Sequence, residues 1–349
     1  MSSRIAVVVG ATGQIGRATV RTLVADGWRV RAVSRRGADL SEWPEAVEPL
    51  SADREDDAGL AAAVGDGCEV LVDCVAYGES HARQLAALAD RIGSAVVISS
   101  AAVYEDEQGR GFMTQDQPDG APQYPVPLPE SHRTVAPGDG DYARKKVALE
   151  QLLLAEGERL PVTLLRAGAV HGPHSPYPRE LYFVKRVLDG RRVRLLAWGG
   201  DSRFHPVHVD NLAELVRLAA ARPGSRVLNA GDPQVPTVAE ISAAVDAAMG
   251  APASEIVAVP EPGAAGGVGL TPWSLPTPLV LDMGAAEREL GYRPVTGYAE
   301  SLPATVEYVR ERLAHGTWQD VFPLAARAHA GEPVFDYEAE DRWLAAHRG

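Results

Sequence analysis

Short stretches rich in apolar residues, the weakest of them at residues 47–50, recur along the first half of the chain and predict the strands of a parallel sheet. The runs lie at residues 5–9, 29–33, 47–50, 70–72, 95–98 and 162–165. A strand that is apolar at successive positions is buried on both faces, as in a parallel sheet covered by helices. Stretches with helical spacing separate the runs at residues 15–24, 57–64 and 81–90. This alternation predicts an α/β fold with a doubly wound parallel sheet.

The second half of the chain has a less regular pattern. Residues 105–140 contain six prolines among many Asp and Gly residues, which predicts a long loop. A helix is predicted at 142–156, just before the last strong apolar run. Thr237 and Glu240 form a capping box that predicts the start of a later helix. Residues 315–349 have no clear period, so we expect a polar tail there.

A glycine-rich turn joins the first predicted strand to the first predicted helix. Gly10 permits the tight turn, Gly13 lets a pyrophosphate approach the backbone, and Gly16 lets the helix pack closely on the strand. The N-terminus of the helix then faces the phosphates. In this strand–turn–helix context the glycines predict a dinucleotide-binding turn more strongly than a purely structural one. The residues expected to contact the cofactor here are Gly10, Thr12, Gly13, Gln14, Ile15 and Gly16.

The end of the second predicted strand bears on the choice of cofactor. An acidic residue at this place binds a free ribose 2′-hydroxyl, whereas an arginine accommodates a 2′-phosphate. This chain has Ser34, Arg35 and Arg36 there and no acid. We therefore expect NADP(H) rather than NAD(H), unless the arginines are simply solvated. Asp53, at the end of the third strand, is expected to accept a hydrogen bond from the adenine amino group, or only to open a helix.

Tyr142 and Lys146 form the most informative pair of side chains. The chain has only three lysines against 31 arginines, yet Lys145 and Lys146 both follow Tyr142 closely. Residues four apart share a helix face. An ammonium beside a phenol favours the phenolate, so we expect the pKa of Tyr142 to fall toward neutral pH, which would make it a general acid or base. The alternative is an ordinary surface contact between the two side chains.

Other polar residues are candidates for contacts with a substrate. Ser100 ends the fifth predicted strand, where a hydroxyl points into the cofactor crevice, although it could instead cap its own turn. The histidines show no metal-ligand spacing on a helix and no cysteine joins them, so we expect no metal. The residues proposed to line the substrate pocket are His81, Tyr104, His171, Arg179 and Arg203.

These motifs resemble the extended short-chain dehydrogenases/reductases, often called the NAD-dependent epimerase/dehydratase family. The matching segments, in family order over about residues 4–313, are the glycine turn, Asp53, Ser99 to Tyr104, Tyr142 with Lys146, Leu165 to Pro173, Val207 to Asp210 and Asp282 to Pro294.

The resemblance implies a Rossmann domain with a smaller C-terminal substrate-binding domain. The Rossmann domain would be mainly residues 1–172, with 203–230 returning to it. The substrate-binding domain would be mainly 173–202 and 231–314, followed by the tail at 315–349.

The resemblance also implies residue roles. Tyr142 is implied as the acid or base, Ser100 as the donor to the substrate oxygen, and Lys146 as the ribose ligand that tunes the phenol. Ala76 is implied as a further cofactor contact.

Departures from the family pattern narrow the expected reaction. Sugar dehydratases of the family have an Asp-Glu pair after the serine, where this chain has Ala101 and Ala102, which move no protons. Nucleotide-sugar epimerases have an Asn at the position of Ala169. We therefore expect NADPH-dependent reduction of a carbonyl, or oxidation of a secondary alcohol. The alternatives are an NAD-dependent nucleotide-sugar epimerase and, less favoured, a dinucleotide sensor without catalysis.

Charge and composition limit the expected partners and location. The net charge of −13 and the absence of a basic block argue against nucleic acid and anionic membranes, which leaves a small-molecule substrate. No apolar run reaches transmembrane length, and the only cysteines, Cys68 and Cys74, suit a reducing compartment. We expect a cytoplasmic protein that is a monomer or a dimer.

Overall fold

The computed structural model describes residues 4–35, 43–332 and 334–347. It divides into two compact units, each of which combines separate parts of the chain. The first unit consists of the described residues within Met1–Val170, Val207–Gly231 and Leu281–Val295. The second unit consists of those within His171–Pro206, Asp232–Val280 and Thr296–Gly349. Residues 281–295, which the sequence placed with the substrate-binding segments, thus return to the first unit.

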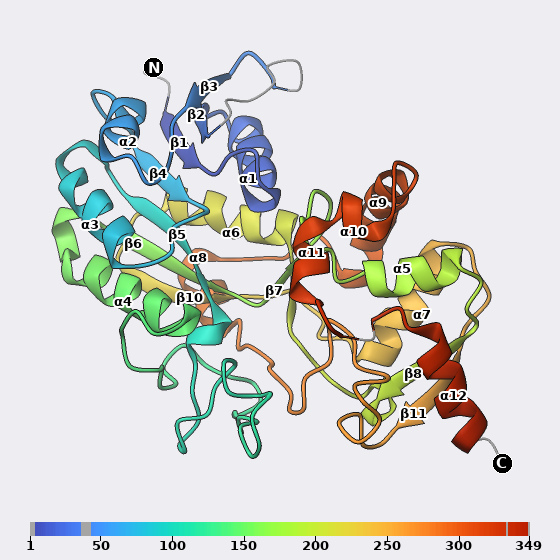
Figure 1. Ribbon diagram of the computed structural model, residues 1–349. Helices are drawn as coiled ribbons and strands as arrows, with labels where there is room; N and C mark the ends of the chain where they lie inside the picture. The colour runs from blue at the N-terminus through green and yellow to red at the C-terminus, as the bar shows by residue number, and fades with distance from the viewer. Residues whose placement is uncertain (1–3, 36–42, 333, 348–349) are drawn as a thin grey trace. The chain divides into compact units, whose positions relative to one another are not determined.

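A seven-stranded parallel sheet is the centre of the first unit (Figure 1). Its strands are β1 (Ile5–Val9), β2 (Arg29–Ser34), β3 (Val47–Ser51), β4 (Val70–Asp73), β5 (Ala95–Ser100), β6 (Val162–Ala167) and β10 (Arg226–Ala230). The strand order is β3-β2-β1-β4-β5-β6-β10, and every neighbouring pair is parallel. This order confirms the predicted Rossmann-like, doubly wound sheet. The order reverses between β1 and β4, which creates a crevice at their carboxyl ends.

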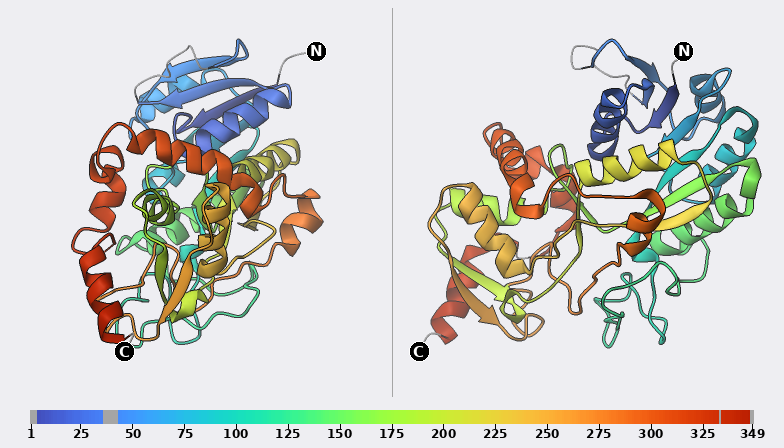
Figure 2. Two further views of the ribbon diagram at one scale, coloured as in Figure 1. Left: turned by 90° about the vertical axis from the view of Figure 1, so that its right-hand side faces the viewer. Right: turned by 180° about the vertical axis from the view of Figure 1, so that it is seen from behind.

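Helices cover both faces of this sheet because alternate strand residues point to opposite sides (Figure 2). Val8 and the strand residues on the same face of the sheet pack with α1 (Gln14–Ala25), α6 (Val209–Ala221) and α8 (Gly284–Leu290). Val7 and the strand residues on its face of the sheet pack with the helices that cover that face. Those helices are α2 (Asp57–Val64), α3 (Glu79–Ala87) and α4 (Tyr142–Ala155). The short 3-10 helices of this unit are η2 (Ala89–Arg91), η3 (Ala101–Val103) and η4 (Gly157–Arg159).

The segment between η3 and α4 is irregular but well connected. Asp106 is buried and accepts hydrogen bonds from the backbone N–H groups of Gln108, Arg110 and Gln123. The guanidinium of Arg110 also contacts its carboxylate at 2.7 Å. These hydrogen bonds hold the pKa of Asp106 at about 2 against the opposing effect of burial. The predicted loop is therefore organised around one buried carboxylate.

A small parallel pair of strands, β8 (Val193–Ala197) and β11 (Glu255–Val259), belongs to the second unit. The helices of this unit are α5 (Leu181–Leu188), α7 (Val238–Ala248), α9 (Tyr298–Leu313), α10 (Trp318–Val321), α11 (Pro323–Ala328) and α12 (Tyr337–His347). The remaining short elements are η5 (Trp198–Gly200), β7 (Ala169–His171) and β9 (Pro206–His208). Within the described residues, no helix combines the length and the apolarity needed to cross a bilayer.

The C-terminal segment, expected from the sequence as a polar tail without a clear period, forms helices. On α12, red in Figure 2, Trp343 and Leu344 pack against the core formed by Leu195 and Val259. Glu340 is buried and pairs with Arg186 of α5. Tertiary contacts therefore stabilise a helix whose own amphipathic pattern is weak.

Candidate active site

The glycine turn directly follows β1 and leads into α1. The N–H groups of Gly10 and Ala11 donate to the carbonyl of Val33 at 3.0 and 3.1 Å, which anchors the turn to β2. Gly10 has φ +82°, and a Cβ there would lie 2.7 Å from Cγ1 of Val75. Gly13 is the N-cap of α1 and supplies no side-chain cap to the helix. The first turn of α1 is thus arranged as a backbone anion site.

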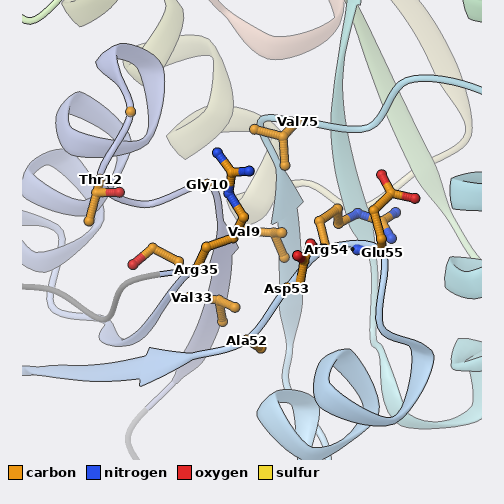
Figure 3. A pocket seen from close by; sticks show the side chains of 12 residues that line it. Val9, Gly10, Thr12, Val33, Arg35, Ala52, Asp53, Arg54, Glu55 and Val75 are labelled. Atoms are coloured by element: carbon orange, nitrogen blue, oxygen red, sulfur yellow. Dashed lines mark hydrogen bonds between the residues drawn. The ribbon is translucent and has the colours of Figure 1, made fainter.

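A cavity of about 400 Å³ opens at the carboxyl ends of these strands (Figure 3). In Figure 3, Thr12 lies on one side of this pocket, Arg54 and Glu55 on the other, and the side chain of Arg35 extends beside Gly10 between them. Its lining residues are Val9, Gly10, Thr12, Gly13, Val33, Ser34, Arg35, Ala52, Asp53, Arg54, Glu55 and Val75. The pocket therefore joins the glycine turn to the ends of β2 and β3.

The pocket fits a dinucleotide at the places where a ribose and phosphates would lie. Ser34 is buried, and within the described residues its hydroxyl has no hydrogen-bond partner. Arg35 is exposed beside it, and Asp53 lines the same pocket. A buried hydroxyl without a partner is costly, so a ligand that hydrogen-bonds to it would relieve this cost. Arg36 lies outside the described residues.

A buried ion pair lies next to this pocket, and the sequence analysis did not predict it. Nε of Arg54 lies 2.7 Å from Oδ2 of Asp73, and both side chains are buried. The other carboxylate oxygen of Asp73 accepts the N–H of Val75 at 3.0 Å. Arg54 also donates to the carbonyl of His81 and to Gln84. The pair thus connects the segment after β3 and the end of β4 to α3. In the sequence, the only sign of this pair is the acidic residue Asp73 at the end of the apolar run of β4.

Tyr142 is the first residue of α4. Its N-cap, Asp141, accepts the N–H of Arg144 at 2.9 Å, which fixes the start of the helix. The phenol is half-buried. Burial raises the pKa of Tyr142, and a hydrogen bond with the Ser100 side chain opposes this rise. The direction is opposite to the lowered pKa expected from the sequence, because loss of solvation outweighs the favourable effect of Ser100.

Lys146 lies one turn along the same helix and is buried. Its Nζ donates to the carbonyls of Ala76 at 2.6 Å and Ile98 at 2.9 Å, and it lies 5.7 Å from the ring centre of Tyr142. Burial lowers the pKa of Lys146 to about 8, against the attraction of Asp73. An ammonium has three N–H donors, so two backbone contacts leave one for a ligand. Ala76 contributes its carbonyl to this arrangement.

Ser100 ends β5, and its hydroxyl accepts the N–H of Ala102 at 3.1 Å. It caps η3, which is the structural role that the sequence left open, and it opposes the rise in the pKa of Tyr142. The positions where dehydratases have acids are the buried Ala101 and Ala102 of η3.

A buried carboxylate holds α4 against the sheet beneath these residues. Glu150 accepts from the hydroxyl of Ser99 at 2.6 Å and from the guanidinium of Arg166 at 2.7 Å. Ser99 immediately precedes Ser100, and Glu150 lies one turn after Lys146 on α4. These contacts therefore fix the helix that carries Tyr142 relative to the strand that carries Ser100.

Residues 6–231, about two thirds of the chain, match the family described as the NAD dependent epimerase/dehydratase family. The chain belongs to this family. It is an enzyme of the extended short-chain dehydrogenase/reductase class, an oxidoreductase with a Rossmann-like fold.

Three known proteins are similar to the chain over 64% or more of its length. "Sterol demethylase protein B" of Methylococcus capsulatus is 28% identical over 233 residues, which are 64% of this chain and 69% of that protein. The dTDP-glucose 4,6-dehydratase DesIV of Streptomyces venezuelae superposes with a TM-score of 0.67 at 22% identity, covering 91% of this chain and 99% of that one. The UDP-glucose 4-epimerase of Thermus thermophilus has a TM-score of 0.63 at 23% identity, with coverage of 88% and 99%. The two superpositions establish the shared fold.

Within this family member, two of the expected substrate residues are buried in the first unit. Nδ1 of His81 accepts the N–H of Tyr77 at 2.8 Å, and its Nε2 lies 2.8 Å from Glu55. The hydroxyl of Tyr104 donates to Asn229 at 2.7 Å. Burial also raises the pKa of Tyr104 to about 12. Both side chains make internal hydrogen bonds, and their contact with a substrate stays a prediction.

The other three expected substrate residues belong to the second unit. His171 is buried, with Nε2 2.7 Å from the carboxylate of Asp232, so it also serves the interior. The guanidinium of Arg179 lies 5.3 Å from the ring centre of Phe204 and 5.5 Å from that of Trp273. Arg203 is exposed, donates to the carbonyl of Val235, and lines a cavity of about 310 Å³. Arg179 and Arg203 stay predicted substrate residues. Among the described residues, no group of acidic, histidine or cysteine side chains could hold a metal.

Proposed function

We propose that the protein interconverts a carbonyl group and a secondary alcohol on a small molecule, using NADP(H). The main support is the place of Tyr142 at the start of α4, where the Nζ of the buried Lys146 lies 5.7 Å from the ring centre of Tyr142 and is held by the carbonyls of Ala76 and Ile98. Bound in the pocket at the glycine turn, the dinucleotide supplies or accepts the hydride.

Tyr142, Ser100 and Lys146 have separate roles in this proposal. The raised pKa of Tyr142 keeps the phenol protonated at neutral pH, so it can donate a proton to the oxygen of a carbonyl under reduction. The Ser100 hydroxyl holds the same oxygen. The buried Lys146 ammonium places a positive charge beside the phenol and offers a donor to a ribose. Orientation of the reacting groups supplies much of the rate.

The preference for NADP(H) rests on the end of β2. Arg35 is exposed at the rim of the pocket, the adjacent Ser34 hydroxyl lacks a partner within the described residues, and no acid stands there to bind a free 2′-hydroxyl. DesIV and the Thermus thermophilus epimerase were each solved with NAD. NAD(H) is therefore the competing cofactor, and titration of the purified protein with both dinucleotides decides between them.

The alternative is an NAD-dependent epimerase that acts on a nucleotide sugar through a transient ketone. The Thermus thermophilus relative is named for such an activity, and Arg179 or Arg203 would then pair with the diphosphate. Ala169 in place of the family's Asn weighs against it, and Ala101 with Ala102 weighs against dehydration. A dinucleotide sensor is the least favoured reading, because it would not need Tyr142. A cytoplasmic location and a monomeric or dimeric state stay predictions.

The decisive experiment measures NADPH consumption with a panel of ketones, a sterol ketone and nucleotide sugars. We expect net consumption with a ketone. We also expect Tyr142→Phe to lower kcat/KM by about 100-fold or more, because the general acid is lost. Tyr337→Phe in the second unit is the matched control and should leave kcat/KM unchanged. Protein that purifies with a bound dinucleotide and converts a nucleotide sugar without consuming NADPH would establish the epimerase instead. Unchanged activities in Tyr142→Phe would favour the sensor.

A further inference from the structure

The segment that follows β4 carries two exposed apolar side chains on either side of Ala76. Val75 is 46% exposed and lines the dinucleotide pocket. Tyr77 is 45% exposed and is not part of that lining. Single exposed apolar residues are common on proteins, so exposure alone gives Tyr77 no role. Its position does, because its ring centre lies 5.5 Å from that of Tyr142, with the planes tilted by 55°.

The backbone around Tyr77 is held in place by groups around the active site. Its N–H donates to Nδ1 of His81 at 2.8 Å. Because Nδ1 accepts, Nε2 of the neutral imidazole carries the proton and faces Glu55 at 2.8 Å. Nζ of Lys145 lies 5.6 Å from the ring centre of Tyr77. The next residue toward the N-terminus, Ala76, receives the Lys146 ammonium on its carbonyl. The backbone at Tyr77 is thus fixed, and the ring itself contacts Tyr142 and the ammonium of Lys145.

We propose that Tyr77 is a specificity-determining residue whose ring forms an aromatic wall beside the Tyr142 hydroxyl, and that it selects substrates with a flat apolar ring next to the reacting carbon. This inference rests on the proposed function of Tyr142. A half-exposed ring face beside the reacting oxygen stacks on another flat ring and gains contact area without ordering a flexible side chain. A hydroxyl-rich sugar ring gains less from such a surface, because its polar groups must lose water against an apolar ring.

The ring of Tyr77 has an alternative role, contact with the bound dinucleotide, and the experiment distinguishes this role from contact with the substrate. If Tyr77 instead covered the bound dinucleotide, its loss would weaken dinucleotide binding for every substrate alike. If it contacts the substrate, its loss changes the KM for ring substrates and leaves the dinucleotide dissociation constant as it was.

The test compares acetophenone with 2-hexanone, two methyl ketones that differ in the ring, in wild type, Tyr77→Leu and Tyr77→Phe. We expect Tyr77→Leu to raise the KM for acetophenone by about 10-fold, the scale of one aromatic contact, with a change of less than about two-fold for 2-hexanone. Tyr77→Phe keeps the ring and should behave as wild type. Leu154→Ala, an exposed apolar residue near the end of α4, controls for unspecific effects.

Binding measurements keep this proposal distinct from the proposed reaction. Acetophenone affinity in the presence of NADP⁺ is measured by calorimetry or saturation-transfer NMR for wild type and Tyr77→Leu. If no substrate of the panel is turned over, the proposed reaction fails, yet an acetophenone affinity lowered about 10-fold in Tyr77→Leu would still support the wall. Equal effects on both ketones, unchanged acetophenone affinity, or an effect confined to NADP(H) binding would each overturn it.

Discussion

Replacement of Gly16 by alanine tests the close packing on which the dinucleotide turn depends. An added Cβ would lie 2.2 Å from the carbonyl oxygen of Gly10, 2.7 Å from Cα of Ala11 and 2.8 Å from the carbonyl carbon of Gly10. All of these atoms are backbone, so no side-chain rotation can relieve the contacts. Either the turn or the first residues of α1 must move.

Two opposing effects set the size of the change in stability. Alanine is favoured over glycine within a helix by about 1 kcal/mol. Overpacking of a close contact typically costs about 1–3 kcal/mol. The contacts at Gly16 are short and lie on rigid backbone, which places the cost at the upper end. We therefore expect Gly16→Ala to lose about 2 kcal/mol of unfolding free energy net, and to bind NADP(H) at least about 10-fold more weakly.

Urea denaturation measures the first effect and fluorescence titration with NADPH the second. Gly263→Ala is the matched control, because its Cβ would meet no atom within 4 Å and its φ lies outside the left-handed region. That variant should stay within about 0.5 kcal/mol of wild type. If Gly16→Ala is as stable as wild type and binds NADPH equally well, the close-packing argument for this turn is refuted.

Three further predictions concern charged residues of the first unit. Arg35→Ala should weaken NADPH binding by about 10-fold or more and leave NADH binding nearly unchanged, because only NADPH has the 2′-phosphate. Equal losses in fluorescence titrations with both dinucleotides would contradict the assigned role. The pKa of Lys146 is about 8 when folded and 10.5 when exposed, so the unfolded chain binds more protons between these values and stability rises with pH there. Relative to Lys146→Met, the unfolding free energy of wild type, measured by urea denaturation, should rise by up to about 3 kcal/mol between pH 8 and 10.5. A difference between the two proteins that does not change with pH would contradict this reasoning. Arg54→Met leaves Asp73 buried without its ion-pair partner and should cost about 3–5 kcal/mol of unfolding free energy. The double variant with Asp73→Leu should recover part of that loss, and no recovery would show that the pair is not the cause.

Much of the first unit follows from local sequence patterns. The apolar runs at β1, β2, β4, β5 and β6 predict buried parallel strands, and helical spacing between them predicts the crossovers. The glycine turn and the Tyr142–Lys146 spacing are equally local, since each depends only on residues within one or two turns of the chain. Elements of this kind form wherever the pattern can be buried, so sequence reasoning reaches them.

The electrostatic character of the site did not follow from the same patterns. The spacing of Tyr142 and Lys146 indicated a lowered phenol pKa, but burial raises it. Loss of solvation depends on every segment that surrounds a group, and no local pattern reports it. The same holds for His81 and Tyr104, whose hydrogen-bond partners come from distant positions in the chain.

The sequence by itself determined the doubly wound sheet, the dinucleotide turn and the helix that carries the phenol and the ammonium. Only the tertiary structure decided which polar groups are buried with which partners, as with Arg54 and Asp73 or Glu150 and Arg166. It also decided that residues 281–295 join the first unit and that the C-terminal segment folds as helices, one of which buries Glu340 against Arg186. Periodicity depends on residues that are close together in the sequence, whereas desolvation and ion pairing depend on contacts between residues far apart in the chain.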